Sequence, residues 1–287
     1  MIMILIFSIY LMMSSMEWLL MWSGMEINVL AFLSLCKSTS NQGDEFEFKY
    51  FIIQFIGSTM FLMSSLFNSS ILLFASLSLK LLLVPFVFWI LPCLNWINKE
   101  TFIYLLTMQK IGPLFIMISF VKISKLFINF LFLNIIISLF FIYKKNSMKF
   151  IMTFSSVTQL SFMILLINIS LGTIYAFFFI YVISSFFTML ACLYYSFSLK
   201  KSLILFIISG FPPFFLFFFK MWLIKLMVIF YMKIISIIIV LTSSVMTYVY
   251  MKMMLKNFFF NFFLKINCFV KQPKFWFFFQ ILGLFLI

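Results

Sequence analysis

Apolar segments long enough to cross a lipid bilayer follow one another along almost the whole chain, with short polar turns between them. The chain is 66% hydrophobic and only 9% charged, whereas soluble domains are about 45–50% apolar and about 25% charged. A membrane-spanning helix needs about 20 mostly apolar residues. The sequence therefore predicts an all-α, polytopic membrane protein, and no polar stretch is long enough to form a soluble domain.

The polar turns divide the chain into about eleven expected transmembrane helices. The spans are expected at residues 1–15, 17–36, 49–67, 70–91, 101–121, 125–143, 149–169, 172–198, 202–226, 230–252 and 274–287. The chain begins MIMILIF, with no basic segment and no cleavage site around this apolar run. We therefore expect the first helix to be kept and, if the protein is organellar, expect it to be made inside the organelle.

The fourth and ninth expected spans each combine an interior lysine with an interior proline. The fourth contains Lys80 and Pro85, and the ninth contains Pro212, Pro213 and Lys220. Interrupted helices at matching positions of two half-chains are typical of inverted repeats in transporters. The two halves share too little sequence to establish a repeat directly. We expect helices 4 and 9 to be broken, and a single transmembrane domain 1–287 composed of a first inverted repeat (1–121), a second inverted repeat (125–252), and a polar connection with a C-terminal helix (253–287).

Four charged side chains lie inside the expected spans, namely Glu26, Lys80, Lys110 and Lys220. A charge at the centre of a membrane helix costs about 2.5–3.5 kcal/mol on insertion scales, so such residues usually face a polar path within the bundle. Lys80 could instead extend its amine to the membrane surface, and Glu26 could be protonated and packed. We expect these two to pair within about 4 Å, or through water, because each is otherwise an unpaired charge in hydrocarbon.

Lys110 lies in the fifth expected span, at the join between the two proposed repeats. Gly112 and Pro113 follow it, and we expect them to loosen the backbone and admit water. The run TFSSVTQL, from Thr153 to Leu160, is another polar feature inside a span. Its hydroxyl groups could hydrate a path, although Ser and Thr in membranes more often bond neighbouring helices.

The formal net charge is +14, and every basic residue is a lysine. The lysines are dispersed at the ends of the spans, which indicates membrane orientation rather than nucleic-acid binding. On the side of the N-terminus lie Lys37, Lys49, Lys99, Lys144, Lys145, Lys149, Lys200, Lys201, Lys252, Lys256, Lys265, Lys271 and Lys274. On the other side lie Lys122, Lys125, Lys225 and Lys233. This asymmetry predicts that the N-terminus lies on the inside, in the cytoplasm or matrix.

Cofactor chemistry is not expected in this chain. The sequence has no histidine and four scattered cysteines, so the usual zinc, haem and copper sites have too few ligands. It has no GxGxxG, GxxxxGK[ST] or CxxC motif, and hence no recognisable site for a nucleotide, a flavin or an iron–sulfur cluster.

Six blocks occur in a fixed order within residues 16–222: MWSGMEINVLAF, KYFIIQ, SLKLLLVPFVFW, LLTMQKIGPL, FSSVTQLSFM and GFPPFFLFFFK. Together they resemble the family of mitochondrial NADH dehydrogenase (ubiquinone) subunit 2, an antiporter-like subunit of the membrane arm of respiratory complex I. The resemblance implies eleven helices in two inverted five-helix repeats plus a C-terminal helix. It also implies the mitochondrial inner membrane as the location, with the N-terminus on the matrix side.

The resemblance further implies that Glu26, Lys80, Lys110 and Lys220 form a proton-translocation path. The chain would be a subunit of the proton-translocating NADH:ubiquinone reductase without redox chemistry of its own, because flavin, iron–sulfur clusters and ubiquinone belong to other subunits. Its partners would be other membrane-arm subunits and membrane lipids, and it would not be stable alone.

This chain departs from the family at three places. The family usually has PFHFW where this chain has Val87, and a histidine where this chain has Gln159. The family's Arg-Lys pair before the two serines is here Lys149-Phe150. A mechanism that requires a histidine relay inside this subunit is therefore in doubt.

Three functions remain to be compared. A proton-translocating subunit of a redox complex would use the buried lysines, since a neutral lysine can accept a proton. A stand-alone secondary cation/proton antiporter would need carboxylates around Na⁺ or K⁺, and Glu26 is the one carboxylate expected deep in a span. A structural spacer predicts no penalty when the lysines are neutralised.

Overall fold

The computed structural model describes residues 1–36, 41–120, 125–144, 147–165, 215–229 and 233–262, together with residues 179 and 182. In these residues every regular element is a helix, so the all-α prediction is confirmed there. The chain divides into two units, one made of Met1–Phe141 and Ser147–Ile174 and the other of Ile142–Asn146 and Tyr175–Ile287.

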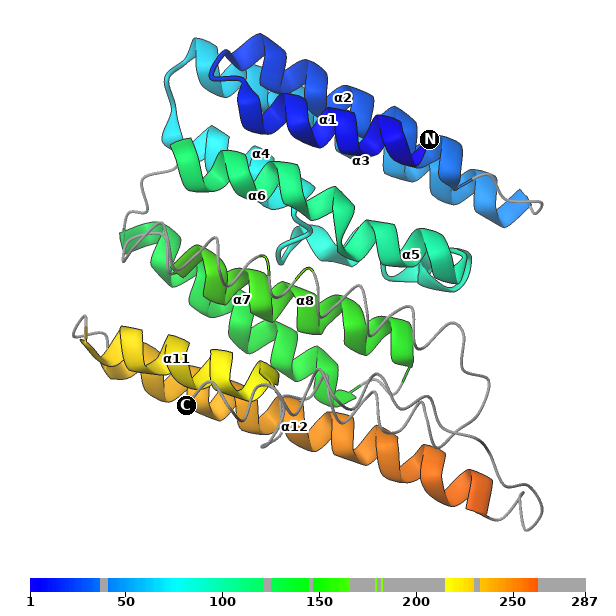
Figure 1. Cartoon of the computed structure of the whole chain (residues 1–287), viewed down its shortest axis with the longest axis vertical. Coiled ribbons are helices and arrows are strands. Elements are labelled where there is room, and N and C mark those ends of the chain that lie inside the picture. Colours follow the sequence, from blue (N-terminus) through cyan, green and yellow to red (C-terminus); the bar gives the residue numbers. More distant parts are fainter. Residues whose placement is uncertain are drawn as a thin grey trace. The chain divides into compact units, whose positions relative to one another are not determined.

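The first unit holds most of the described helices (Figure 1). They are α1 (Ile2–Ser14), α2 (Trp18–Leu35), α3 (Asn41–Leu66), α4 (Ser70–Lys80), α5 (Lys99–Leu106), α6 (Met108–Phe120), α7 (Lys125–Lys144, whose last turn belongs to the second unit) and α8 (Met148–Leu165). Helix α3 packs against both α2 and α4, and α6 packs against α1, α4 and α5. The second unit holds α11 (Phe215–Ile229) and α12 (Lys233–Phe262).

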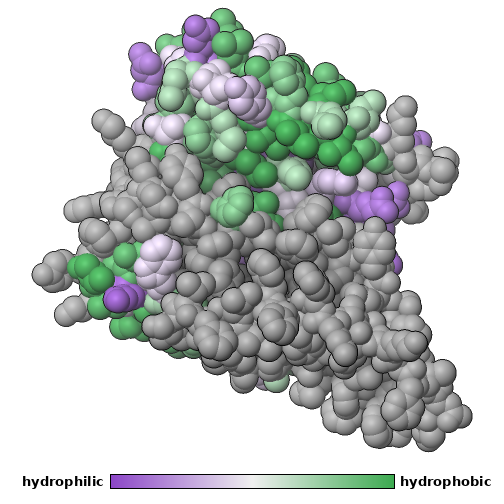
Figure 2. Space-filling model, viewed as in Figure 1, coloured by the Kyte–Doolittle hydropathy of each residue, from purple (hydrophilic) through white to green (hydrophobic). Residues whose placement is uncertain are grey.

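Several of these helices are suited to a bilayer. The segments long and apolar enough to cross one are Trp18–Leu35, Lys99–Phe120 (α5 and α6 together), Leu126–Lys144 and Met148–Leu165. Large apolar side chains are exposed on the outer faces, including Phe7 at 55% and Phe55 at 45%, and Figure 2 shows hydrophobic side chains gathered over the described surface. Lipid, unlike water, stabilises exposed apolar faces of this extent. The chain is therefore a multi-pass membrane protein.

The fourth expected span is broken, as its proline predicts. Helix α4 ends at Lys80, and the chain continues through two short 3₁₀ turns, Phe86–Trp89 and Pro92–Asn95. Leu82 closes the helix with a left-handed backbone (φ 59°), which costs a residue other than glycine about 1–2 kcal/mol. Its N–H donates to the Leu79 carbonyl, and the next N–H donates to Ser78, so the last carbonyls of α4 are satisfied.

Two polar side chains from other helices support the segment after the break. The buried amide of Asn134 in α7 accepts a hydrogen bond from the backbone N–H of Val84. The amine of Lys149 in α8 donates to the carbonyl oxygens of Leu94 and Ile97, at 2.8 and 2.6 Å. These bonds satisfy backbone groups that the lost helix leaves without partners. Sequence reasoning identified neither residue in this role.

The fifth expected span is interrupted, which was not predicted from the sequence. Its backbone is continuous through Gly112 and Pro113, and the interruption lies at Thr107, between α5 and α6. Gly112 instead permits close packing, because a Cβ atom there would overlap the terminal methyl of the buried Met12 in α1. The helix is therefore not broken at Gly112 and Pro113, and the expectation that they loosen its backbone and admit water stays a prediction.

Other expectations have mixed outcomes. Helix α3 begins at Asn41 rather than at residue 49, and α12 continues to Phe262 rather than ending at 252. The break expected at Pro212-Pro213 lies outside the described residues. The division of the chain into two packed units does not test whether its two halves are related as repeats. The count of eleven helices and the repeats 1–121 and 125–252 therefore stay predictions.

Candidate functional site

Lys110 is a buried lysine whose one polar contact among the described residues is a neutral hydroxyl group. It lies in α6 with 2% of its surface exposed, and its amine donates to the hydroxyl oxygen of Ser156 in α8 at 2.8 Å. Ser156 in turn donates to the Thr153 carbonyl at 2.6 Å, so its lone pairs face the amine. Among the described residues Lys110 has no carboxylate partner. Because a neutral amine can also donate to a hydroxyl, this contact survives the loss of the proton.

The residue before Lys110 belongs to a buried chain of hydrogen bonds. The Tyr50 hydroxyl of α3 donates to the Gln109 side-chain oxygen at 3.0 Å, and the Gln109 amide donates to the Asn28 side-chain oxygen of α2 at 2.7 Å. The Tyr50 ring also lies 6.1 Å from the ring of Trp89, beyond the break in α4. Two helices, α2 and α3, are thereby tied to the turn of α6 that carries Lys110, which restricts the rotation of α6. The sequence signal was available, since these polar residues interrupt apolar spans.

Lys80 is the last residue of α4 and is 5% exposed. Among the described residues its amine forms no hydrogen bond and no ion pair within 4.0 Å. The Glu26 carboxylate in α2 is the charge close enough to act on it electrostatically. The amine thus lies in a protein interior with a carboxylate within electrostatic range but not in contact.

The expected direct ion pair between Glu26 and Lys80 is not formed. Glu26 is half-buried, and its Oε1 atom is buried without a hydrogen-bond partner. Helix α3 packs closely against both α2 and α4, whereas α2 and α4 do not pack closely on each other. Direct contact was therefore the wrong expectation, and a bridge through water stays a prediction.

The hydroxyl groups of α8 mostly bond to their own helix. Thr153, Ser155, Thr158 and Ser161 are buried, and each donates to a carbonyl oxygen three or four residues earlier. In the described part, Ser156 is the hydroxyl of this run that receives a bond from another helix. The interpretation that these groups join neighbouring helices therefore holds at that one position.

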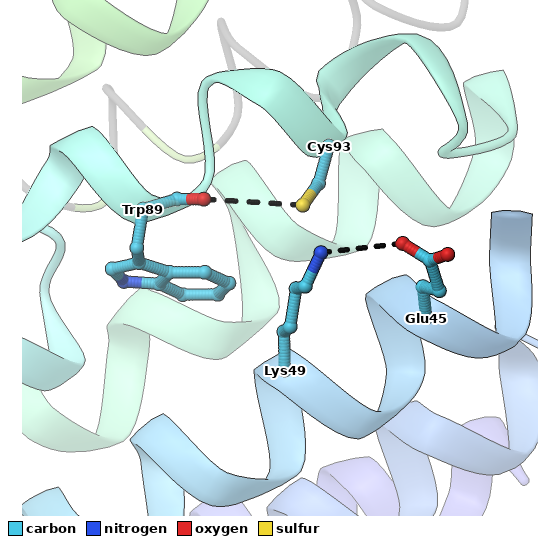
Figure 3. A network of polar contacts seen from close by, with 4 residues as sticks. All are labelled: Glu45, Lys49, Trp89 and Cys93. Carbon is cyan, nitrogen blue, oxygen red and sulfur yellow. Dashed lines mark hydrogen bonds and ion pairs between the residues drawn. The ribbon is translucent and has the colours of Figure 1, made fainter.

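A second polar group lies at the end of α3 and is more exposed. Lys49 forms an ion pair with Glu45 at 3.3 Å, and its amine lies 5.4 Å from the centre of the Trp96 ring. Figure 3 shows Lys49 extending toward the segment that carries Cys93, whose thiol donates to the Trp89 carbonyl oxygen at 3.9 Å. Exposed pairs of this kind contribute little stability. Burial raises the pKa of the Cys93 thiol, with Lys49 opposing and Glu45 adding to the shift, so the thiol stays protonated.

The structure places the four predicted charges in two units. Glu26, Lys80 and Lys110 belong to the first, and Lys220 lies partly buried in α11 of the second. No group of three or more Cys, Asp or Glu side chains that could hold a metal ion occurs within the described ranges.

Comparison with known proteins gives relatives with one name. No family model matches the chain. It is 32% identical to NADH-ubiquinone oxidoreductase chain 2 of Locusta migratoria, over 60% of this chain and 54% of that protein. It is 34% identical to the same-named protein of Artemia franciscana, over 58% of this chain and 54% of that one. The chain thus spans about half the length of the curated relatives it matches.

Solved structures with the same fold belong to large membrane complexes. A chain of respiratory complex I from Thermus thermophilus matches with a TM-score of 0.77 at 18% identity, over 88% of this chain and 68% of that one. A chain of the archaeal membrane-bound sulfane sulfur reductase matches with a TM-score of 0.73 at 14% identity, over 99% and 70%. A chain of the Mrp complex from Dietzia gives 0.71 at 14%, over 94% and 60%. The chain is thus similar in sequence to NADH-ubiquinone oxidoreductase chain 2, and it shares its fold with chains of these three membrane complexes.

Proposed function

We propose that the chain is a core membrane subunit of respiratory complex I that contributes to proton translocation across the mitochondrial inner membrane. The coupled reactions, NADH oxidation and ubiquinone reduction, take place in other subunits. The observation that carries this proposal is the 32–34% identity to NADH-ubiquinone oxidoreductase chain 2 over more than half of the chain. The buried lysines of the first unit support it, because intramembrane ionisable groups usually mark ion paths.

Four residues form the proposed proton path. Glu26 and Lys80 control entry into the first half-channel, Lys110 is the central bridge, and Lys220 serves the exit. Lys110 receives a proton on its lone pair, holds it against the Ser156 oxygen, and releases it without leaving a charged partner behind. A rearrangement that brings Glu26 and Lys80 together or apart changes the positive charge felt at Lys110, and so changes its affinity for the proton.

The proposed architecture follows from the same relationship. It has eleven helices, arranged as two inverted five-helix repeats plus a C-terminal helix, with a second broken helix at Pro212-Pro213 and the N-terminus in the matrix. The excess of lysines on the N-terminal side supports this orientation. The partners are other membrane-arm subunits and lipids, and the chain itself binds no flavin, iron–sulfur cluster or ubiquinone.

Two other functions give different expectations. A stand-alone cation/proton antiporter would need several carboxylates around a desolvated Na⁺ or K⁺, and among the described helices Glu26 is the carboxylate placed deep in an apolar one. A structural spacer would hold neighbouring subunits together and would tolerate neutral residues at all three buried lysine positions.

The test is the state in which the chain is purified. Mild detergent extraction followed by native electrophoresis should recover it only within a large assembly that oxidises NADH. Recovery as a separate protein that exchanges Na⁺ or K⁺ for protons in vesicles would instead identify the antiporter.

A further inference from the structure

Gly57 lies where α3 meets the side chain of Lys80. It is buried in the middle of α3. A Cβ atom built at Gly57 would lie 3.3 Å from Cγ and 3.6 Å from Cε of Lys80, and 3.2 Å from a methyl carbon of Leu79. These two Lys80 carbons are two bonds apart in the stem, so the stem lies across Gly57 instead of pointing at it. A side chain at position 57 would therefore press on the Lys80 stem at Cγ, and the stem or α3 would have to move by a few tenths of an ångström.

The amine of Lys80 has no polar anchor of its own. Among the described residues it forms no hydrogen bond and no ion pair, and Glu26 acts on it only through space. The position of such an amine depends on the packing of its four-carbon stem, which would otherwise be free to change rotamer. Electrostatic interaction between the amine and the carboxylate depends directly on their separation. The contact with Gly57 is therefore one of the contacts that determine where the Lys80 amine lies relative to Glu26.

We infer that Gly57 is a positioning residue for proton transfer at Lys80. Because Gly57 has no side chain, the lysine stem packs directly against the backbone of α3, and this packing keeps the amine near Glu26 without direct contact. This inference rests on the proposed role of Lys80 in proton translocation. It differs from an ordinary role of glycine in helix packing, because it assigns the effect of the residue to the chemistry of Lys80 and not only to the stability of the α3–α4 contact.

The direct test is Gly57→Ala in the assembled complex. The added methyl group would displace the Lys80 stem by a few tenths of an ångström. Small displacements at a reacting group have large effects on rate, so we expect proton pumping per assembled complex to fall by about three- to tenfold. We also expect the dependence of pumping on pH, measured from about pH 6 to about pH 9, to be displaced from that of the native complex. A glycine needed only for packing would lower the amount of complex and leave this pH profile unchanged.

Two controls separate the lysine contact from general packing. Ser58→Ala changes the next residue of α3, whose hydroxyl bonds to the Phe55 carbonyl of its own helix, and it should leave the pH profile unchanged. The double variant Gly57→Ala with Leu79→Ala removes the second close contact and should still show the displaced profile. If neither Gly57→Ala nor the double variant assembles, the glycine serves packing alone and the inference is wrong.

The variant Lys80→Met distinguishes failure of this inference from failure of the proposed function. If Lys80→Met loses pumping while assembled Gly57→Ala retains the native pumping ratio and pH profile, Gly57 does not position the lysine. If both variants pump normally, Lys80 lies outside the proton path, and the proposed path itself is wrong.

Discussion

Replacing Lys110 by methionine tests the proposed path at its most buried charge. The change keeps a flexible stem of similar length and removes the group that can carry a proton. It deletes the 2.8 Å hydrogen bond to Ser156, and hydrogen bonds to charged groups contribute about 1.5–3 kcal/mol. It also removes the several kcal/mol that burial of an ammonium group costs. These terms oppose each other, so we expect Lys110→Met to assemble in near-native amounts.

Pumping should respond very differently from assembly. A positioned acid–base group contributes about 10²- to 10⁴-fold to proton transfer, so protons that must pass Lys110 should cross at least about a hundredfold more slowly. The assay is proton uptake or release by reconstituted vesicles for each NADH oxidised. Lys110→Arg should fail as well, because arginine stays protonated. Ser156→Ala keeps the amine and removes its acceptor, so an intermediate loss is expected. Native pumping by assembled Lys110→Met would refute the relay and favour the structural spacer.

Three further changes test the supports around these lysines. Tyr50→Phe keeps the ring contacts but removes the hydroxyl bonded to Gln109. It should destabilise the complex by about 1 kcal/mol in thermal inactivation, and unchanged inactivation would contradict this. Asn134→Ala leaves the buried Val84 N–H without its acceptor and should destabilise the complex by about 1–3 kcal/mol. Asn134→Asp keeps an acceptor oxygen and is the control. Equal amounts of complex in both variants would show that the acceptor is unimportant. Gly112→Ala places a methyl group against Met12 and should destabilise the complex by about 1–3 kcal/mol in the same assay. Adding Met12→Ala should restore part of this stability, because the smaller side chain makes room for the methyl group. If it does not, the destabilisation has another cause.

The sequence predicts the break in the fourth helix because the cause is local. Proline has no N–H and its ring clashes with the preceding turn, so it favours a break near Pro85. A proline alone is not sufficient, because α6 continues through Pro113. Where α4 ends is less predictable. Its termination at Leu82 uses a left-handed backbone that sequence patterns assign to glycine or asparagine. The segment that follows is bonded by Asn134, which accepts from the N–H of Val84 and lies fifty residues later in the chain.

Burial of the lysines could also be predicted, whereas their partners could not. Lys80 and Lys110 stand within long apolar runs, and such a position already implies burial in a bundle. The identity of the partner depends on which helices become neighbours. Direct pairing of Glu26 with Lys80 was expected from charge alone, but α3 packs against both of their helices and the Lys80 stem lies beside Gly57 of α3. Three-dimensional packing, and not opposite charge, determines the separation of this pair.

In the proposed proton path, no step at Lys110 requires a histidine. A relay through imidazole needs a group that alternates between donor and acceptor. Here the Ser156 hydroxyl accepts from the amine while it donates to a backbone carbonyl, so its acceptor stays in place in both protonation states of the lysine. Asn28, Gln109 and Tyr50 hold the turn beside Lys110 through bonds that involve amides, and amide groups do not titrate in the physiological range. The titrating group and the groups that position it are therefore different residues, and the absence of histidine removes no member of this arrangement.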